Sequence, residues 1–231
     1  NCYIVPSIPV KKTLSKIVKG KIAIINHGYN KNFIFKNKKN PITQKLNILT
    51  VGGYMPHKQQ HLIPYVGKSL KKREIDFSWI IAGPHNRLPE YFNYVKYLCH
   101  KFKLSGIMQI YKSLDFVTLN KKYQDADLYV QPSLEEGFCL TALDAAYMGI
   151  PIIGGEAGAI PVLAQETGGI HSKASIDSIT DSIILLNNKI QTIKKSDIRS
   201  KIKHKYSWEK AAKLHENEYR YQYYKINKTK F

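Results

Sequence analysis

The most constraining stretch of this 231-residue sequence is residues 126–162, ADLYVQPSLEEGFCLTALDAAYMGIPIIGGEAGAIPV. Residues 127–131 are a short apolar, β-branched and aromatic run, which predicts a buried strand. A loop follows, and residues 138–148 carry apolar side chains all round, as a buried helix does. Gly149 suits the position that ends this helix, and residues 150–153 resume a strand.

One acid is out of place in this helix. Asp144 stands where packing alone would favour leucine or alanine. Acidic side chains are rarely fully buried without a partner, so we expect a polar group above Asp144. A second acid, Glu136, comes just before the helix, so the two carboxylates need not share a face.

Strands and helices alternate through the rest of the chain. We expect strands at 22–25, 46–51, 77–82, 107–111 and 168–171, and helices at 59–71, 88–102, 117–124, 174–187 and 208–224. Such alternation predicts an α/β fold, with a parallel sheet covered by helices on both faces.

The formal net charge of +19 suggests a nucleic-acid partner. The lysines, however, are scattered along the chain, with no cluster on a helix face and no known motif. We therefore attribute the charge to biased codon composition and to attraction toward anionic ligands or lipid surfaces, and expect no specific nucleic-acid binding.

The cysteines, Cys2, Cys99 and Cys139, are widely spaced and fit neither a metal site nor a disulfide framework. This favours a reducing, cytoplasmic setting. No apolar run reaches the roughly 18 residues of a membrane span. The sequence has no initiator methionine and no recognisable signal peptide.

The central stretch resembles the signature of the retaining glycosyltransferases of family 4, the group 1 glycosyl transferases. That signature is Glu-Gly-Phe, a second glutamate eight residues after the first, and Gly-x-Pro before a strand. Its positions are matched by Glu136, Gly137, Phe138, Gly149 and Pro151, with Asp144 at the place of the second glutamate.

Other segments are similar to the family's motifs, in the family's order, from about residue 22 to 219. They are 25–28 (its Pro-Asn-Gly turn), 51–58 (its Val-Gly-Arg…Lys segment), 80–83 (its Ile-Ala-Gly strand end) and 158–161 (its Gly-Gly-x-Pro). The resemblance implies a Rossmann-like sheet, the carboxyl-terminal half of a GT-B fold. Residues 1–20 would be the tail end of a preceding N-terminal domain, 21–205 the nucleotide-sugar-binding domain, and 206–231 a terminal helix and tail.

The implied reaction is transfer of a sugar from a nucleotide-diphosphate-sugar to a glycan or lipid acceptor, as in polysaccharide biosynthesis. The family retains the anomeric configuration and needs no metal and no cofactor beyond the donor. The chain's own N-terminal Rossmann half, upstream, would be a partner, and the protein would be cytoplasmic or peripheral at a membrane. A non-catalytic domain that binds nucleotide-sugar or a partner protein is the alternative.

The resemblance also assigns roles to residues. Glu136 would accept hydrogen bonds from the donor sugar and Asp144 from the ribose, while Lys58 would meet the diphosphate leaving group. The remaining donor-binding positions would be Gly52, Gly53, Gly137, Phe138, Cys139 and Leu140. Taken alone, Glu136 would be a solvated loop acid, Lys58 a surface lysine and Asp144 a structural acid.

Two departures from the family bear on activity. The arginine that usually accompanies the lysine falls at Gly53, and Val162 stands where an acid is frequent. The candidates for a substitute positive charge are His27, His57 and Arg87.

Two further patterns are interpreted as structural. Asp125 and Asp127 have the spacing of a metal-binding Asp-x-Asp motif, but they precede a strand instead of following one. Residues 219–224, with Lys225 and Lys228, mix aromatic and basic side chains as membrane or nucleic-acid segments do, and we expect a terminal helix that packs back on the domains.

Overall fold

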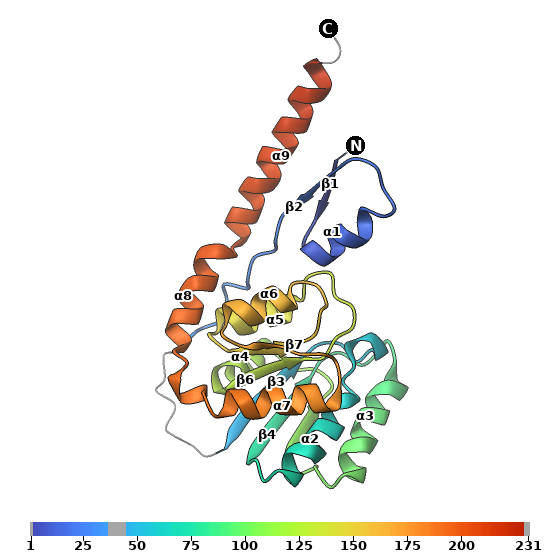
Figure 1. The fold of residues 1–231 in the computed structure, drawn as a ribbon, viewed down its shortest axis with the longest axis vertical. Helices are drawn as coiled ribbons and strands as arrows, with labels where there is room; N and C mark the ends of the chain where they lie inside the picture. The colour runs from blue at the N-terminus through green and yellow to red at the C-terminus, as the bar shows by residue number, and fades with distance from the viewer. Residues whose placement is uncertain (1, 37–44, 229–231) are drawn as a thin grey trace.

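The computed structural model describes residues 2–36 and 45–228 (Figure 1). In this part of the chain, a six-stranded parallel sheet has the order β5-β4-β3-β6-β7-β8, and a separate parallel pair joins β1 to β2. The strands are β1 (Cys2–Val5), β2 (Lys21–Ile24), β3 (Leu46–Val51), β4 (Phe77–Ala82), β5 (Met108–Tyr111), β6 (Leu128–Gln131), β7 (Ile152–Gly154) and β8 (Ile170–His171). The helices are α1 (Ile8–Leu14), α2 (Leu62–Lys72), α3 (Pro89–Lys101), α4 (Phe116–Asp125), α5 (Leu140–Tyr147), α6 (Ile160–Glu166), α7 (Ile176–Asn187), α8 (Lys195–Lys205) and α9 (Trp208–Lys228).

The direction of winding reverses in the middle of the six-stranded sheet. From β3 the chain proceeds outward through β4 to β5, then returns to the other side of β3 and proceeds outward through β6, β7 and β8. This is the Rossmann order, in which ligands bind beyond the carboxyl ends of the strands at the point of reversal. The loops that follow β3 and β6 lie at that point.

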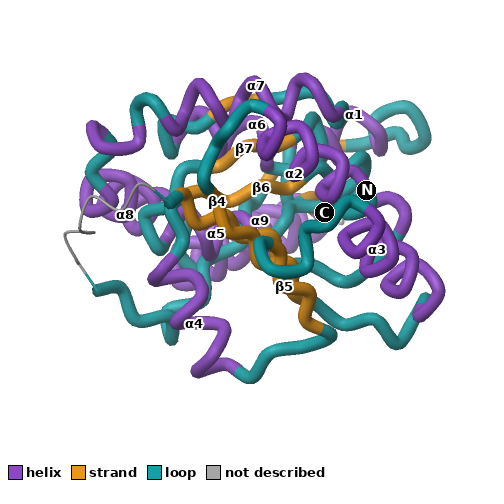
Figure 2. The backbone as a smooth tube through the Cα atoms, turned by 90° about the horizontal axis from the view of Figure 1, so that it is seen from below, coloured by secondary structure: helices purple, strands orange, loops and turns teal. Residues whose placement is uncertain are grey.

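The sheet separates two hydrophobic cores, because successive side chains on a strand point to opposite faces. Ile48, Trp79 and Val130 pack with α2, α3 and α7 on one face. Leu49 and Tyr129 pack with α4, α5, α6 and α8 on the other. The strands of the larger sheet run through the middle of the view in Figure 2, with α7 on one side of them and α4 on the other. The predicted α/β class, with both faces covered, is confirmed.

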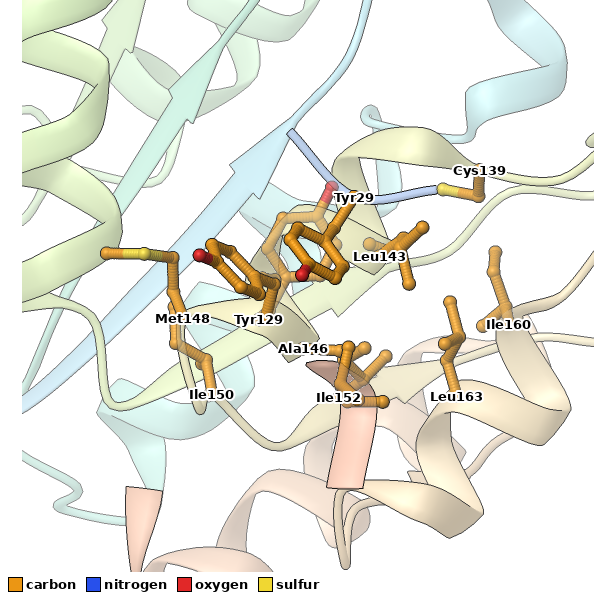
Figure 3. Close-up of a cluster of buried hydrophobic side chains, with 14 of the residues drawn as sticks. Tyr29, Tyr129, Cys139, Leu143, Ala146, Met148, Ile150, Ile152, Ile160 and Leu163 are labelled. Carbon is orange, nitrogen blue, oxygen red and sulfur yellow. The ribbon is translucent and has the colours of Figure 1, made fainter. Parts of the chain in front are cut away.

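Helix α5 is the centre of the second core. Its Leu143 and Ala146 are fully buried against Ile152 of β7 and Leu163 of α6 (Figure 3). Gly149 follows the helix with a φ of +76°, as predicted for its end. The amides of residues 149 and 150 then donate to the carbonyls of Ala146 and Ala145, which is the Schellman pattern.

The small sheet and α9 lie to one side of the six-stranded sheet (Figure 1). The strand expected at 22–25 is present as β2, but it pairs with β1 and takes no part in the larger sheet. Glu218 of α9 bonds Lys21 of β2 at 2.6 Å and accepts from Cys2 of β1 at 3.2 Å. The predicted domain boundaries, after residue 20 and after residue 205, stay a prediction.

Two terminal features differ from what the sequence suggests. Helix α8 was not predicted, since its only buried side chains are Ile198 and Ile202 among many lysines. In α9, the expected terminal helix, Glu218 fastens the helix to the small sheet, and Tyr221 lies below the Lys21 ammonium at 4.6 Å. The tyrosines of residues 219–224 are nevertheless exposed, so this segment does not pack back as a whole.

Candidate functional site

The loop after β3 is held in place by buried polar contacts. Tyr54, 1% exposed, donates from its hydroxyl toward the carbonyls of Ile81 and Tyr111, at 3.1 and 3.0 Å. Gln60 donates its amide hydrogens to the carbonyl of Gly53 at 2.8 Å. The loop that contains Gly52 and Gly53 is therefore fixed before any ligand arrives.

Lys58 and Glu136 meet at the carboxyl ends of β3 and β6. Lys58 ends a 3₁₀ turn, Pro56–Lys58, and the carbonyl of its neighbour His57 accepts from the Leu134 amide at 2.8 Å. This bond ties the two loops together. Lys58 Nζ lies 2.6 Å from Glu136 Oε1, and the two side chains are 20% and 8% exposed. The sequence alone allowed Glu136 to be a solvated loop acid. In the structure its side chain is instead buried and paired with Lys58.

Glu136 has a second donor, Ser133, whose hydroxyl lies 2.9 Å from the same oxygen, Oε1. Ser133 in turn accepts from the Gln131 side chain at 2.7 Å. Sequence reasoning missed both residues. The one available signal was a polar residue, Gln131, at the end of an otherwise apolar buried strand.

The predicted loop residues between Glu136 and α5 have different surroundings. In the described part of the chain, nothing lies within 4 Å of the point where a Cβ on Gly137 would stand. The Cα side of Gly137 is thus free of described neighbours, whereas its carbonyl accepts from the Ser7 hydroxyl at 2.7 Å. Phe138 is buried and contributes its ring to the core, against His27 at 5.2 Å between centroids. Leu140, at the start of α5, is 45% exposed.

Cys139 occupies a strained position for a residue with a side chain. Its φ is +79°, in the left-handed region that glycine adopts without cost. Burial raises the pKa of its thiol to about 12, so the sulfur stays protonated and packs as an apolar group. Of the predicted donor-binding residues, Cys139 and Phe138 thus have their side chains in the core and offer only backbone groups.

The segment of residues 158–161, which leads into α6, lies against Glu136 through Gly158. Gly158 has a φ of +57°, and a Cβ added there would stand 2.8 Å from the Glu136 Cβ. The amide of Ala159 donates to the Phe138 carbonyl at 2.9 Å. The two glycine-containing motifs that the sequence singled out separately are therefore one packed unit.

Asp144 has the polar partner that the sequence called for. Its Oδ1 accepts from the backbone amide of Asn30 at 2.8 Å. Burial is the main cause that raises its pKa, to about 6, and the Asn30 amide opposes the shift. Asp144 thereby holds the segment that follows β2 against α5.

None of the three candidate substitute cations is placed beside Lys58 by a described contact. Burial, with a smaller contribution from nearby His215, lowers the pKa of His27, which disfavours a positive charge on its ring. Arg87 is exposed in the loop before α3. His57 adjoins Lys58 in the chain but is tied to Leu134 through its backbone.

The two acids of the Asp-x-Asp pattern lie at the amino end of β6, whereas Lys58 and Glu136 lie beyond the carboxyl ends of β3 and β6. Asp125 ends α4, and Asp127 precedes β6 and accepts from the backbone and side-chain nitrogens of Asn47 at 3.0 and 3.1 Å. Within residues 2–36 and 45–228, no group of three or more His, Cys, Asp or Glu residues could hold a metal ion. Nor is any helix of these ranges both long enough and apolar enough to cross a membrane.

The comparison with family models decides the family. Residues 31–205 match the model described as "Glycosyl transferases group 1". The chain belongs to this family. A search of the curated proteins found no match.

Solved glycosyltransferase structures share the fold of this group 1 chain. A sucrose-phosphate synthase from Thermosynechococcus elongatus superposes with a TM-score of 0.79 at 20% identity, over 96% of this chain and 58% of its own. A glycosyltransferase from Rickettsia africae has the same TM-score and identity, over 94% of this chain and 62% of its own. This chain thus spans about three fifths of the length of either protein.

A third structure is itself a single carboxyl-terminal domain, and this chain covers most of its length. It is the C-terminal domain of a glycosyl transferase group 1 family protein from Francisella tularensis, with a TM-score of 0.60 at 20% identity, over 69% of this chain and 85% of its own. The prediction of a GT-B carboxyl-terminal domain is confirmed.

Proposed function

We propose that this chain is the donor-binding half of a glycosyltransferase that transfers a sugar from a nucleotide-diphosphate-sugar with retention of configuration. The observation that carries the proposal is the ion pair between Lys58 and Glu136, 2.6 Å long, at the point where the winding of the sheet reverses. A cation and a carboxylate held together there offer one group for the diphosphate and one for the sugar.

The roles follow from charge. The Lys58 ammonium stabilises the negative charge that develops on the leaving diphosphate, together with the positive end of the α5 dipole. Glu136 accepts hydrogen bonds from sugar hydroxyls, and its charge favours the positive character that the sugar acquires in the transition state. The loop glycines, Gly52, Gly53 and Gly137, let backbone groups approach the ligand. Asp144 binds the ribose.

The acceptor, a glycan or a lipid, would bind between this half and an upstream Rossmann half. No metal is required in this proposal, because Lys58 and backbone amides provide the positive potential. The three cysteines are free, which suits a reducing cytoplasm, and the net charge of +19 suits a position at an anionic membrane surface.

Isothermal titration in the presence of a chelator tests the proposal. We expect at least one of UDP-glucose, UDP-N-acetylglucosamine, GDP-mannose and ADP-glucose to bind, and Lys58→Ala to weaken binding of the free diphosphate as well. A folded chain that binds none of these nucleotides would count against a working donor site.

A second candidate function is a non-catalytic nucleotide-sugar or protein-binding domain. It is favoured by Gly53, which stands where the family's second diphosphate-binding cation is usual. A restored arginine at this position separates a loop that serves a diphosphate from one that serves a partner protein.

A further inference from the structure

A chain of buried hydrogen bonds reaches Glu136 from the core, and the roles proposed above do not use it. Tyr129 and Gln131 lie on one face of β6, two residues apart, and Ser133 follows in the loop. The Tyr129 hydroxyl lies 2.9 Å from Gln131 Oε1, and Gln131 Nε2 lies 2.7 Å from Ser133 Oγ. Ser133 Oγ is 2.9 Å from Glu136 Oε1. Gln131 and Ser133 are 0% and 1% exposed.

The direction of this chain is fixed from the Glu136 end. An ionised carboxylate only accepts, so Ser133 must donate its single hydrogen to Glu136. Ser133 must then accept from the Gln131 amide nitrogen, which turns the amide oxygen toward Tyr129. If the amide were reversed, Ser133 would have to donate to Gln131, and Glu136 would lose a donor.

The far end of the chain is anchored on two other elements. The Tyr129 hydroxyl lies 2.9 Å from the carbonyl of Val51, at the end of β3, and 2.9 Å from the hydroxyl of Thr141 in α5. The Tyr129 hydroxyl has one hydrogen, so it donates either to the Val51 carbonyl or to Gln131 Oε1, while Thr141 can donate to it. The contacts that reach Glu136 thus involve β3, β6 and α5.

Both donors meet the same oxygen of Glu136. Lys58 Nζ and Ser133 Oγ lie 2.6 and 2.9 Å from Oε1. Oε2 receives no hydrogen bond from any residue that the structure describes. With Oε1 held on two sides, the carboxylate has one orientation, and Oε2 is the oxygen that remains for a ligand.

We propose that Gln131 and Ser133 are positioning residues that hold Glu136 through Oε1 and so present Oε2 to a hydroxyl of the donor sugar. The identity of that ligand rests on the proposed function, whereas the hold on Glu136 does not. A structural alternative is that the Ser133 hydroxyl only satisfies its own buried loop. The two readings differ in whether Ser133 and Glu136 are energetically coupled.

The first experiment measures that coupling without any ligand. Unfolding equilibria are compared for the wild type, Ser133→Ala, Glu136→Ala and the double variant. We expect the two changes to deviate from multiplicative behaviour by on the order of tenfold in the unfolding equilibrium constant, as residues in one network do. Ser182→Ala is the matched control, because Ser182 is buried on α7 and donates to the Ser178 carbonyl at 2.7 Å. It should combine with Glu136→Ala multiplicatively, within about twofold.

The second experiment measures the ratio of affinities for each nucleotide-sugar named above and for its free nucleoside diphosphate, in chelator. We expect Ser133→Ala to reduce this ratio by about tenfold while it changes affinity for the free diphosphate by less than about twofold. Ser133→Thr, which keeps the hydroxyl, should restore the ratio. Gln131→Met keeps the length of the side chain but cannot donate to Ser133, so it should reduce the ratio in the same direction as Ser133→Ala does.

The outcomes separate the two proposals. Multiplicative behaviour of Ser133→Ala with Glu136→Ala would overturn the hold on Glu136, whatever binds. Coupling with an unchanged affinity ratio would overturn the role of Oε2 toward the sugar. A third outcome is that Ser133 and Glu136 are coupled but the wild-type chain binds none of the nucleotides. This result would support the hold on Glu136 and refute the proposed function.

Discussion

At the scale of single residues, Asp144 is where a structural role and a binding role can be separated. Its Oδ1 is already occupied by the Asn30 amide, and no described donor reaches Oδ2. The first contact is a structural one. The second oxygen leaves room for the ribose contact that the family resemblance implies.

Asp144→Asn is therefore expected to weaken nucleotide binding by about 1–3 kcal/mol, the cost of losing a charged acceptor. The amide oxygen of asparagine can still accept from Asn30, so folding should not suffer. Titration calorimetry and thermal unfolding on the same samples check both quantities. A clear loss of stability with unchanged affinity would refute the ribose assignment, and Asp144→Glu, the usual family residue, should keep affinity.

The same substitution should alter the dependence of stability on pH. Burial raises the pKa of Asp144 from 3.8 to about 6, so the folded state binds the proton more tightly than the unfolded state. The free energy of unfolding should therefore fall as pH rises from about 4 to 6, by an amount on the order of 2 kcal/mol from this residue. Asp144→Asn should remove this contribution and hold or raise stability at pH 7. Denaturant unfolding at pH 4.5 and 7 measures it.

Gly53 is the position that tests whether the loop after β3 serves a diphosphate. A Cβ at this position would stand 3.6 Å from two atoms of Pro84, an ordinary contact, and Gly53 is not among the residues with positive φ. A side chain thus fits, and Gly53→Arg should strengthen diphosphate binding by about 1–2 kcal/mol, with Gly53→Ala as the control. Calorimetry at two salt concentrations measures the gain. An arginine variant that binds no better than the alanine variant would favour a loop that does not serve a diphosphate.

At the scale of elements, α8 shows what packing adds to local sequence pattern. Arg199 of α8 donates to the carbonyl and to the hydroxyl of Tyr147, at 3.0 and 2.7 Å. Its guanidinium carbon lies 3.9 Å from the centre of the Tyr147 ring, whose other neighbour is Tyr29, stacked at 3.8 Å. This contact fastens α8 and the segment after β2 to the end of α5.

Arg199→Lys should lower the free energy of unfolding by about 1–3 kcal/mol, because lysine cannot reproduce two directed bonds and a stacked plane. Arg220→Lys provides a control on α9, where an exposed arginine pairs with Glu216 four residues earlier. That change should cost less than about 0.5 kcal/mol. Denaturant unfolding measures both variants. Equal losses in the free energy of unfolding would show that the contact between Arg199 and Tyr147 stabilises the fold no more than an exposed ion pair does.

Elements with a strong local pattern were predictable from the sequence. β3 and β4 lie at the residues expected from their apolar runs, and Gly149 follows the end of α5 as expected. Helix α8 was not predictable, since a helix with two buried side chains among lysines has little periodicity of its own. The pairing of β2 with β1, the strand order and the partners of Glu136 depend on contacts between distant segments, which no local pattern contains.

At the scale of the whole molecule, the candidate site lies at one end of the six-stranded sheet, where Lys58 and Glu136 meet. The segment between β1 and α1 reaches its loop, because the Ser7 hydroxyl donates to the Gly137 carbonyl at 2.7 Å. The two solved glycosyltransferases with TM-scores of 0.79 are longer, and this chain covers 58% and 62% of them. Transfer needs a second surface to bind the acceptor and to exclude water.

We therefore expect the 231-residue chain to bind a nucleotide-sugar and yet to transfer or hydrolyse it at a negligible rate. Binding requires only the loops that β3, β6 and α5 already hold in place, whereas closure over the sugar requires a facing domain. The rate is measured as the release of free nucleoside diphosphate from the nucleotide-sugar that binds best. It is measured with and without a mixture of glycan and lipid acceptors. The Glu136→Gln variant gives the background. Turnover well above this background by the chain alone would show that one half suffices, and the two-domain argument would then be wrong.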